Sequence, residues 1–222
     1  MYQPDDWRPE MKPLLSAITV VLLSSGIAVV GPGERNQSDD AASDPSEVIQ
    51  MVQEWKVPFD DTRSRDPYVA PDGTVFFAGQ RADYIGFFDM ETESFDYHPL
   101  EDGTGPHTVV VGDDGTVWYA GNRARHIGRM DAATGEITRF MMDDDYARDP
   151  HTFAFNRDGN IWFTAQGGNG VGLFNVSTGE TRVIPVPTER ARPYGIRMAP
   201  DGQQPWVALQ CRQRRPLLEF FC

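Results

Sequence analysis

Two histidines head two copies of one sequence pattern, and histidine is a side chain well suited to proton transfer near neutral pH. His107 stands in "GPHTVVVGDDGTVWYAGN" and His151 in "DPHTFAFNRDGNIWFTAQ", each directly after a proline. An unperturbed imidazole titrates at about 6.5, so it can accept or donate a proton at neutrality. Two such groups side by side could bind a metal, orient a polar substrate or move a proton. The pattern therefore predicts His107 and His151 as catalytic residues.

A competing interpretation gives these histidines a purely structural role. Each ring would then cap the start of a strand and form a hydrogen bond with a neighbouring loop. Tyr68 and Tyr194 also follow a proline, which suggests that folding does not require histidine at this position. Both interpretations stay open from the sequence alone. His98 and His126 are expected in outer strands or turns, with structural roles.

A repeat sets where these residues lie. Asp-Gly pairs, each followed by an aromatic residue, recur at steps of 42 to 44 residues, and Ile-Gly, Val-Gly and Thr-Gly pairs keep nearly the same spacing. A period of about 40 to 45 residues is typical of propeller blades. The Asp-Gly pairs begin at Asp72, Asp114, Asp158 and Asp201.

Each copy of the repeat predicts four short strands separated by tight turns. In the second copy the strands are expected over 107–111, 116–121, 126–131 and 136–140. The sequence after residue 50 has no helical periodicity, so the fold class is all-β. We expect a β-propeller of four-stranded antiparallel blades, with about three complete blades and part of a fourth within residues 54–210.

Strand pairing predicts which side chains accompany the histidines. If strand one pairs with strand two, His107 lies beside Asn122 and His151 beside Gln166, at the end of strand two. The first strand of a blade is expected to line the central channel, whose mouth suits a ligand site. The predicted substrate contacts are Tyr68, Gln80, Asn122, Gln166 and Tyr194.

The repeat resembles that of the virginiamycin B lyase, or streptogramin lyase, family over about residues 54–209. The segments that carry the resemblance are "GPHTVVVGDDGTVWYAGNRARHIGRMDAATGE" and "DPHTFAFNRDGNIWFTAQGGNGVGLFNVSTGE". The resemblance implies an elimination that opens a cyclic ester without water, in which a base removes the proton α to a carbonyl. His107 and His151 match the two histidines of the family, one as base and one as substrate contact.

The resemblance also implies Mg²⁺ as a cofactor, held by a glutamate four residues after the tryptophan of a blade. This chain carries amides at those positions, and an amide is a weaker ligand for a hard cation than a carboxylate. No residue is therefore assigned as a metal ligand. The positions are occupied by Gln80, Asn122, Gln166 and Gln210.

Charge and chain ends limit the partners and the location. A net charge of −13 argues against nucleic acid as a partner. The expected channel mouth suits a small-molecule ligand, and open blade edges would permit self-association. Residues 1–31 predict a signal peptide or N-terminal anchor, and so a periplasmic or extracellular location. Residues 32–53 predict an acidic disordered linker, and residues 211–222 an aberrant tail from truncation or a frameshift. Cys211 and Cys222 do not form a disulfide framework.

The sequence thus favours an exported propeller that acts as a lyase or hydrolase on a small cyclic ester, lactone or peptide-like substrate. Two alternatives stay open. One is a non-catalytic propeller of the cell envelope that binds a ligand or a protein. The other is a truncated copy without function.

Overall fold

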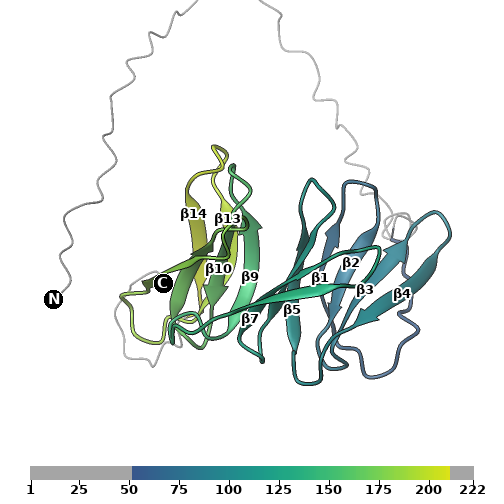
Figure 1. Cartoon of the computed structure of the whole chain (residues 1–222), viewed down its shortest axis with the longest axis horizontal. Helices are drawn as coiled ribbons and strands as arrows, with labels where there is room; N and C mark the ends of the chain where they lie inside the picture. Colours follow the sequence, from purple (N-terminus) through teal and green to yellow (C-terminus); the bar gives the residue numbers. More distant parts are fainter. Residues whose placement is uncertain (1–51, 211–222) are drawn as a thin grey trace, which may run out of the picture. The chain divides into compact units, whose positions relative to one another are not determined.

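The computed structural model describes residues 52–210, and all its strands lie in the second of two units, Trp55–Cys222 (Figure 1). The expected signal peptide or anchor, most of the expected linker and the expected tail lie outside the described residues. Within residues 52–210 no helix is long and apolar enough to cross a membrane.

Fourteen strands make up the described part of the chain, and they fall into three four-stranded sheets and one two-stranded sheet. The first sheet contains β1 (Ser64–Val69), β2 (Val75–Gly79), β3 (Tyr84–Asp89) and β4 (Ser94–Pro99). The second contains β5 (Pro106–Val111), β6 (Val117–Gly121), β7 (His126–Met130) and β8 (Ile137–Met141). The third contains β9 (Pro150–Phe155), β10 (Ile161–Ala165), β11 (Gly170–Phe174) and β12 (Thr181–Pro185). The last pair is β13 (Pro193–Met198) and β14 (Pro205–Leu209).

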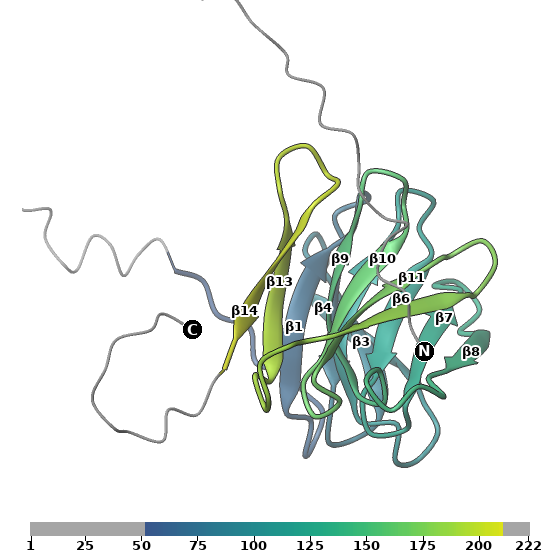
Figure 2. The same ribbon diagram turned by 90° about the vertical axis from the view of Figure 1, so that its left-hand side faces the viewer.

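Each sheet is a blade in which strands that follow one another in sequence pair antiparallel. The first strands of successive blades are neighbours: β1 contacts β5, β5 contacts β9, and β9 contacts β13. Figure 2 gives a second view of these strands. The predicted four-stranded antiparallel blades are confirmed, as three complete blades and two strands of a fourth.

The Asp-Gly pairs form the hairpin turns between the first and second strands. Gly115 has a φ of 80°, in the left-handed region that glycine adopts at little cost. The carboxylate of Asp114 accepts a hydrogen bond from the backbone N–H of Thr116 at 3.0 Å. The left-handed backbone of the glycine and the local hydrogen bond of the aspartate therefore stabilise the hairpin turn.

The Ile-Gly and Val-Gly landmarks mark close packing within a blade. A Cβ placed on Gly128 of β7 would lie 2.0 Å from the ring of Tyr119, which β6 lays across it. A Cβ on Gly86 would likewise clash with the ring of Phe77, and a Cβ on Gly172 with the ring of Phe163. The third strand thus needs glycine because an aromatic ring of the second strand occupies the space of a side chain.

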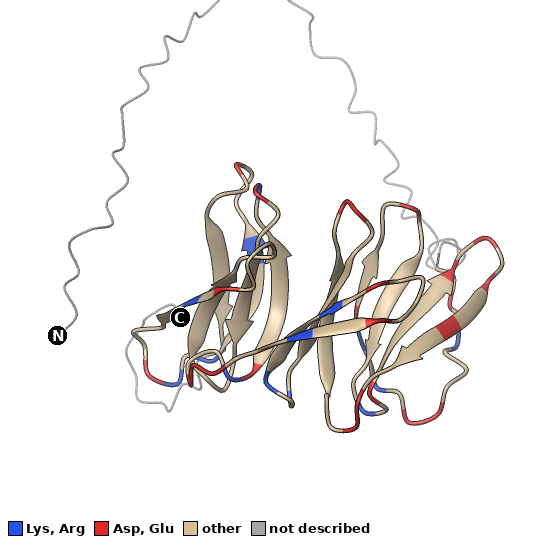
Figure 3. Cartoon of the chain, in the orientation of Figure 1, with Lys and Arg blue, Asp and Glu red and all other residues tan. Residues whose placement is uncertain are grey.

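The hydrophobic core lies between blades rather than within one. One cluster joins the first and second blades around Ile85, Val109 and Tyr119, and another joins the second and third around Trp118 and Phe163. Figure 3 shows that the charged positions gather mainly in the turns and connections. Each blade therefore presents its apolar faces to its neighbours.

Candidate functional site

A β-bulge in each first strand places the candidate residues. In the second blade Pro106 pairs with Gly121 and Val109 with Tyr119, so His107 and Thr108 together face a single residue of β6. The third and fourth blades show the same irregularity. Bulges re-aim side chains and are common beside active sites.

This register corrects the expected pairing of the first blade. Tyr68 pairs with Phe76 and does not lie beside Gln80. Ser64 pairs with Gly79 as Pro106 pairs with Gly121, so Arg65, and not Tyr68, occupies the position equivalent to His107. The four equivalent positions are Arg65, His107, His151 and Tyr194.

The structure brings the two predicted catalytic histidines into contact. The ring centroids of His107 and His151 lie 3.6 Å apart, with the planes tilted by 36°. The ring of Tyr194 follows, with its centroid 4.6 Å from that of His151. Both histidines are buried, with exposed fractions of 4% and 5%. Three successive blades therefore contribute one stack of rings.

Asp66 of β1 joins this stack from the first blade. Its Oδ2 lies 3.5 Å from Nδ1 of His107 and accepts a hydrogen bond from Oγ1 of Thr108 at 2.5 Å. Burial acts to raise the pKa of Asp66. The hydrogen bonds from His107 and Thr108 and the charge of His107 outweigh that effect and lower this pKa from 3.8 to about 2. Asp66 is therefore ionised at neutral pH.

His151 is held as a neutral imidazole. Burial lowers the pKa of His151, and the positive charge of His107 lowers it further, from 6.5 to about 3. Its Nδ1 lies 2.9 Å from the hydroxyl oxygen of Thr152. His151 can therefore form hydrogen bonds at neutral pH without carrying charge.

The predicted amide contacts connect blades to one another. Nδ2 of Asn122 donates to the backbone oxygen atoms of Asp149 and Pro150, at 3.3 and 3.0 Å. Nε2 of Gln166 donates to Oε1 of Gln210 at 2.9 Å.

Gln80, the remaining predicted amide, lies in the first blade. It accepts a hydrogen bond from Nε of Arg65 at 2.9 Å, and its backbone oxygen accepts one from Arg123. All three amides thus have protein partners.

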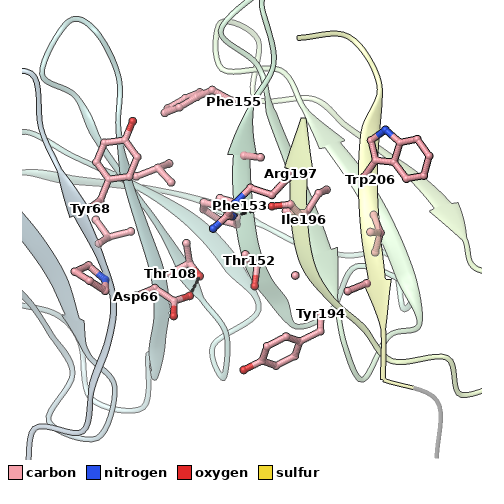
Figure 4. A pocket seen from close by; sticks show the side chains of 17 residues that line it. Asp66, Tyr68, Thr108, Thr152, Phe153, Phe155, Tyr194, Ile196, Arg197 and Trp206 are labelled. Atoms are coloured by element: carbon pink, nitrogen blue, oxygen red, sulfur yellow. Dashed lines mark hydrogen bonds between the residues drawn. The ribbon is translucent and has the colours of Figure 1, made fainter. Parts of the chain in front are cut away.

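A cavity of about 1040 Å³ runs between β1 on one side and β13 and β14 on the other (Figure 4). Its polar end carries Asp66, Thr108, Thr152 and Tyr194, and its aromatic end carries Tyr68, Phe155 and Trp206. Two predicted contacts, Tyr68 and Tyr194, line it. Thr108 and Thr152, the residues directly after the histidines, form part of its wall.

The described residues do not fit a magnesium site. No three His, Cys, Asp or Glu side chains within residues 52–210 are grouped so that they could hold a metal ion. At the expected ligand positions stand the amides of Asn122 and Gln166, whose nitrogen atoms donate hydrogen bonds to neighbouring blades. The chemistry below therefore uses only side chains of this chain.

The repeat of blades and the shared rim of ring side chains define a β-propeller. The family model of the virginiamycin B lyase family matches residues 47–215, so the chain belongs to this family. A search of curated proteins gave no match.

Solved structures agree with the family. Virginiamycin B lyase from Staphylococcus aureus is 27% identical, with a TM-score of 0.64, over 70% of this chain and 52% of that one. The same values hold for a catalytically inactive histidine-to-alanine variant of it with quinupristin. A gluconolactonase from Xanthomonas campestris, 19% identical with a TM-score of 0.55 over 67% and 55% of the two chains, shares the fold alone. The chain thus spans about half the length of these proteins.

The sequence did not predict Asp66, Arg65 or the threonines of the cavity wall as site residues. The tripeptide "PHT" occurs twice, so the threonine after each histidine, Thr108 and Thr152, could have been recognised from the sequence. Asp66 and Arg65 gave no such signal, because the proline of the first blade stands three positions further along its strand than in the other blades.

Proposed function

We propose that this chain provides the catalytic side chains of a lyase or hydrolase that acts on a small cyclic ester, lactone or peptide-like substrate. The observation that carries the proposal is the contact between the His107 and His151 rings, 3.6 Å apart at the ends of two neighbouring first strands. Family membership adds to it, since a solved relative that is 27% identical is a virginiamycin B lyase.

The two histidines take different roles because their surroundings differ. Nδ1 of His107 lies 3.5 Å from the carboxylate of Asp66, which can hold the ring in one orientation, so His107 is the base. His151 stays neutral at working pH and orients the substrate by hydrogen bonding.

In the elimination, His107 takes the proton on the carbon α to a carbonyl. The electron pair of that C–H bond forms a C=C bond, and the C–O bond to the ester oxygen breaks. The carboxylate leaves, and no water is consumed. In the hydrolytic form of the reaction, His107 instead takes a proton from water while the water oxygen adds to the carbonyl carbon of the ester. The acyl C–O bond then breaks, and His107 returns the proton to the leaving alkoxide oxygen.

The cavity supports a small-molecule ligand. Its volume of about 1040 Å³ is slightly above the usual range for ligand sites, about 300 to 1,000 Å³. Asp66, Thr108 and Thr152, which contact the buried histidines, line the polar end and suit the reacting ester, and the aromatic end suits an apolar body.

A non-catalytic ligand-binding propeller is the second candidate. The observation that favours it is that Asn122 and Gln166 stand at positions where the family resemblance implies a glutamate, and that their amide nitrogens donate to neighbouring blades. Binding without turnover would support this candidate.

The test incubates the full chain with quinupristin and follows the products by mass spectrometry. A ring-opened product of unchanged mass indicates a lyase, and a product heavier by one water indicates a hydrolase. His107→Ala and His151→Ala should each lower kcat/KM by about 100-fold or more. His98→Ala, in the outer strand β4, is the matched control and should keep full activity. Equal activity of all four proteins would contradict the proposal.

A further inference from the structure

Asp66 has no counterpart in the other blades. The equivalent positions, by the register of the first strands, are Thr108, Thr152 and Gly195. Within the described blades, only the first therefore places a carboxylate at this point of the cavity wall. The side chain of Asp66 is 43% exposed, and it lines the cavity.

We propose that Asp66 is a positioning residue for His107: its carboxylate accepts a hydrogen bond from Nδ1–H of the imidazole and so leaves Nε2 as the atom that takes a proton. The catalytic meaning of this contact rests on the proposed function. The contact itself does not depend on any substrate.

The geometry is that of a carboxylate shared by a ring and a hydroxyl. Oδ2 of Asp66 lies 3.5 Å from Nδ1 of His107 and 2.5 Å from Oγ1 of Thr108. The same hydroxyl oxygen lies 3.5 Å from Nδ1. Because the hydroxyl of Thr108 donates to Asp66, it holds the carboxylate beside the ring. Figure 4 shows Asp66 and Thr108 pointing toward each other across the gap between blades.

Charges around His107 favour this arrangement. Asp66 contacts His107 from β1, and the ring of His151 contacts it from β9. The positive charges of Arg65 and Arg192 act on His151. Asp66 is the acidic group among them, and it is in direct contact with the ring. When His107 takes a proton, the new positive charge lies next to this carboxylate, which stays ionised throughout.

A merely structural role for Asp66 is the competing explanation. The first and second blades already share an apolar core of buried side chains that includes Ile85, Val109 and Tyr119. A partly exposed carboxylate would add little to that interface, since exposed polar contacts contribute little to stability.

The first experiment reads the contact without substrate, by NMR of the full chain labelled with ¹⁵N and ¹³C. We expect His107→Gln to raise the pKa of the Asp66 carboxyl group from about 2 to its ordinary value of 3.8 or above, because burial then acts with less opposition. We also expect Asp66→Ala to move the ¹⁵N shifts of His107 away from the form protonated at Nδ1. Asp96→Asn, an exposed position on β4, should change neither signal. Unchanged Asp66 and His107 signals in the first two variants would overturn the proposal.

The second experiment measures turnover of quinupristin. Asp66→Asn should lower kcat by roughly 100-fold with little change in KM, because it acts through the base and not through binding. Asp66→Glu should recover part of the loss. If the wild-type chain turns nothing over, the proposed function fails, and the NMR result still decides whether Asp66 positions His107. Full kcat in Asp66→Asn, with an active wild type, would overturn the positioning role.

Discussion

His151 is a histidine that the packing of adjacent blades buries almost completely. Its ring is packed between those of His107 and Tyr194, and only 5% of the residue is exposed. An imidazole in such a place cannot exchange its protein contacts for water when it becomes charged. The neutral ring is therefore the folded form, and the proton is taken up mainly when the chain unfolds.

This placement predicts a loss of stability in mild acid. The unfolded chain takes up a proton on His151 at about its ordinary pKa of 6.5, while the folded chain does so only at a pKa of about 3. Because the unfolded state binds more protons between these values, the free energy of unfolding falls as pH falls from 7 to 3. His151 should contribute about 4 kcal/mol to this loss.

Urea unfolding of the full chain at several pH values measures the effect. His151→Gln should flatten the pH dependence, and His151→Tyr, which copies Tyr194 of the fourth blade, should flatten it equally. Burial also lowers the pKa of His126, but His126 is present in all three proteins, so the difference reports His151 alone. Identical slopes in the wild type and both variants would show that His151 is not buried as a neutral ring.

The sequence predicted that His107 and His151 lie close together, but it did not predict which acidic residue contacts them. His107 and His151 occur at the same point of two adjacent repeats, so their proximity followed once the repeat was recognised. The acidic partner did not follow, because a bulge in the first strand decides which residue faces the ring, and a bulge has no clear sequence signal. The amides were expected to lie beside the histidines. Instead, the residue before each histidine, Pro106 or Pro150, pairs with the last residue of strand two.

Among the elements, the third strand of each blade depends most visibly on one residue type. Gly128 lies under the ring of Tyr119, which is 1% exposed and cannot move into water. The strands themselves were predictable to within one or two residues, because hairpin turns and alternating apolar residues mark them. The need for glycine within a strand was visible as a landmark, and the structure supplies its physical cause.

A methyl group at Gly128 should therefore destabilise the fold. Gly128→Ala would place Cβ 2.0 Å from the ring of Tyr119, and overpacking of this kind costs about 1 to 3 kcal/mol. Gly195→Ala on β13 is the matched control, because its added Cβ meets nothing within 4 Å. Thermal unfolding of both variants measures the difference. A melting temperature of Gly128→Ala equal to that of the control would mean that Tyr119 moves aside freely.

On the scale of the whole molecule, each described blade contacts mainly the blades next to it, through first strands and shared apolar faces. Stability in such an array is close to a sum of blade terms and interface terms. Trp118 and Trp206 occupy equivalent positions, yet their exposed fractions are 5% and 66%. Equivalent residues therefore differ in burial according to what packs beside their blade. Self-association through open edges and export stay predictions.

Because each blade contacts mainly its neighbours, weakening one interface should lower the stability only of the two blades that share it. Asn122 connects the second blade to the first strand of the third by donating to Asp149 and Pro150. Asn122→Ala removes both hydrogen bonds and should cost about 1 to 2 kcal/mol. In hydrogen exchange, amides of β5, β6, β9 and β10 should lose protection, while those of β2 and β3 keep it.

Gln203→Ala, which removes an exposed amide in the hairpin between β13 and β14, is the control and should leave the protection of all these strands unchanged. An equal loss of protection in β2 and β3 would mean that the blades open as a single cooperative unit, and stability could then not be divided among interfaces.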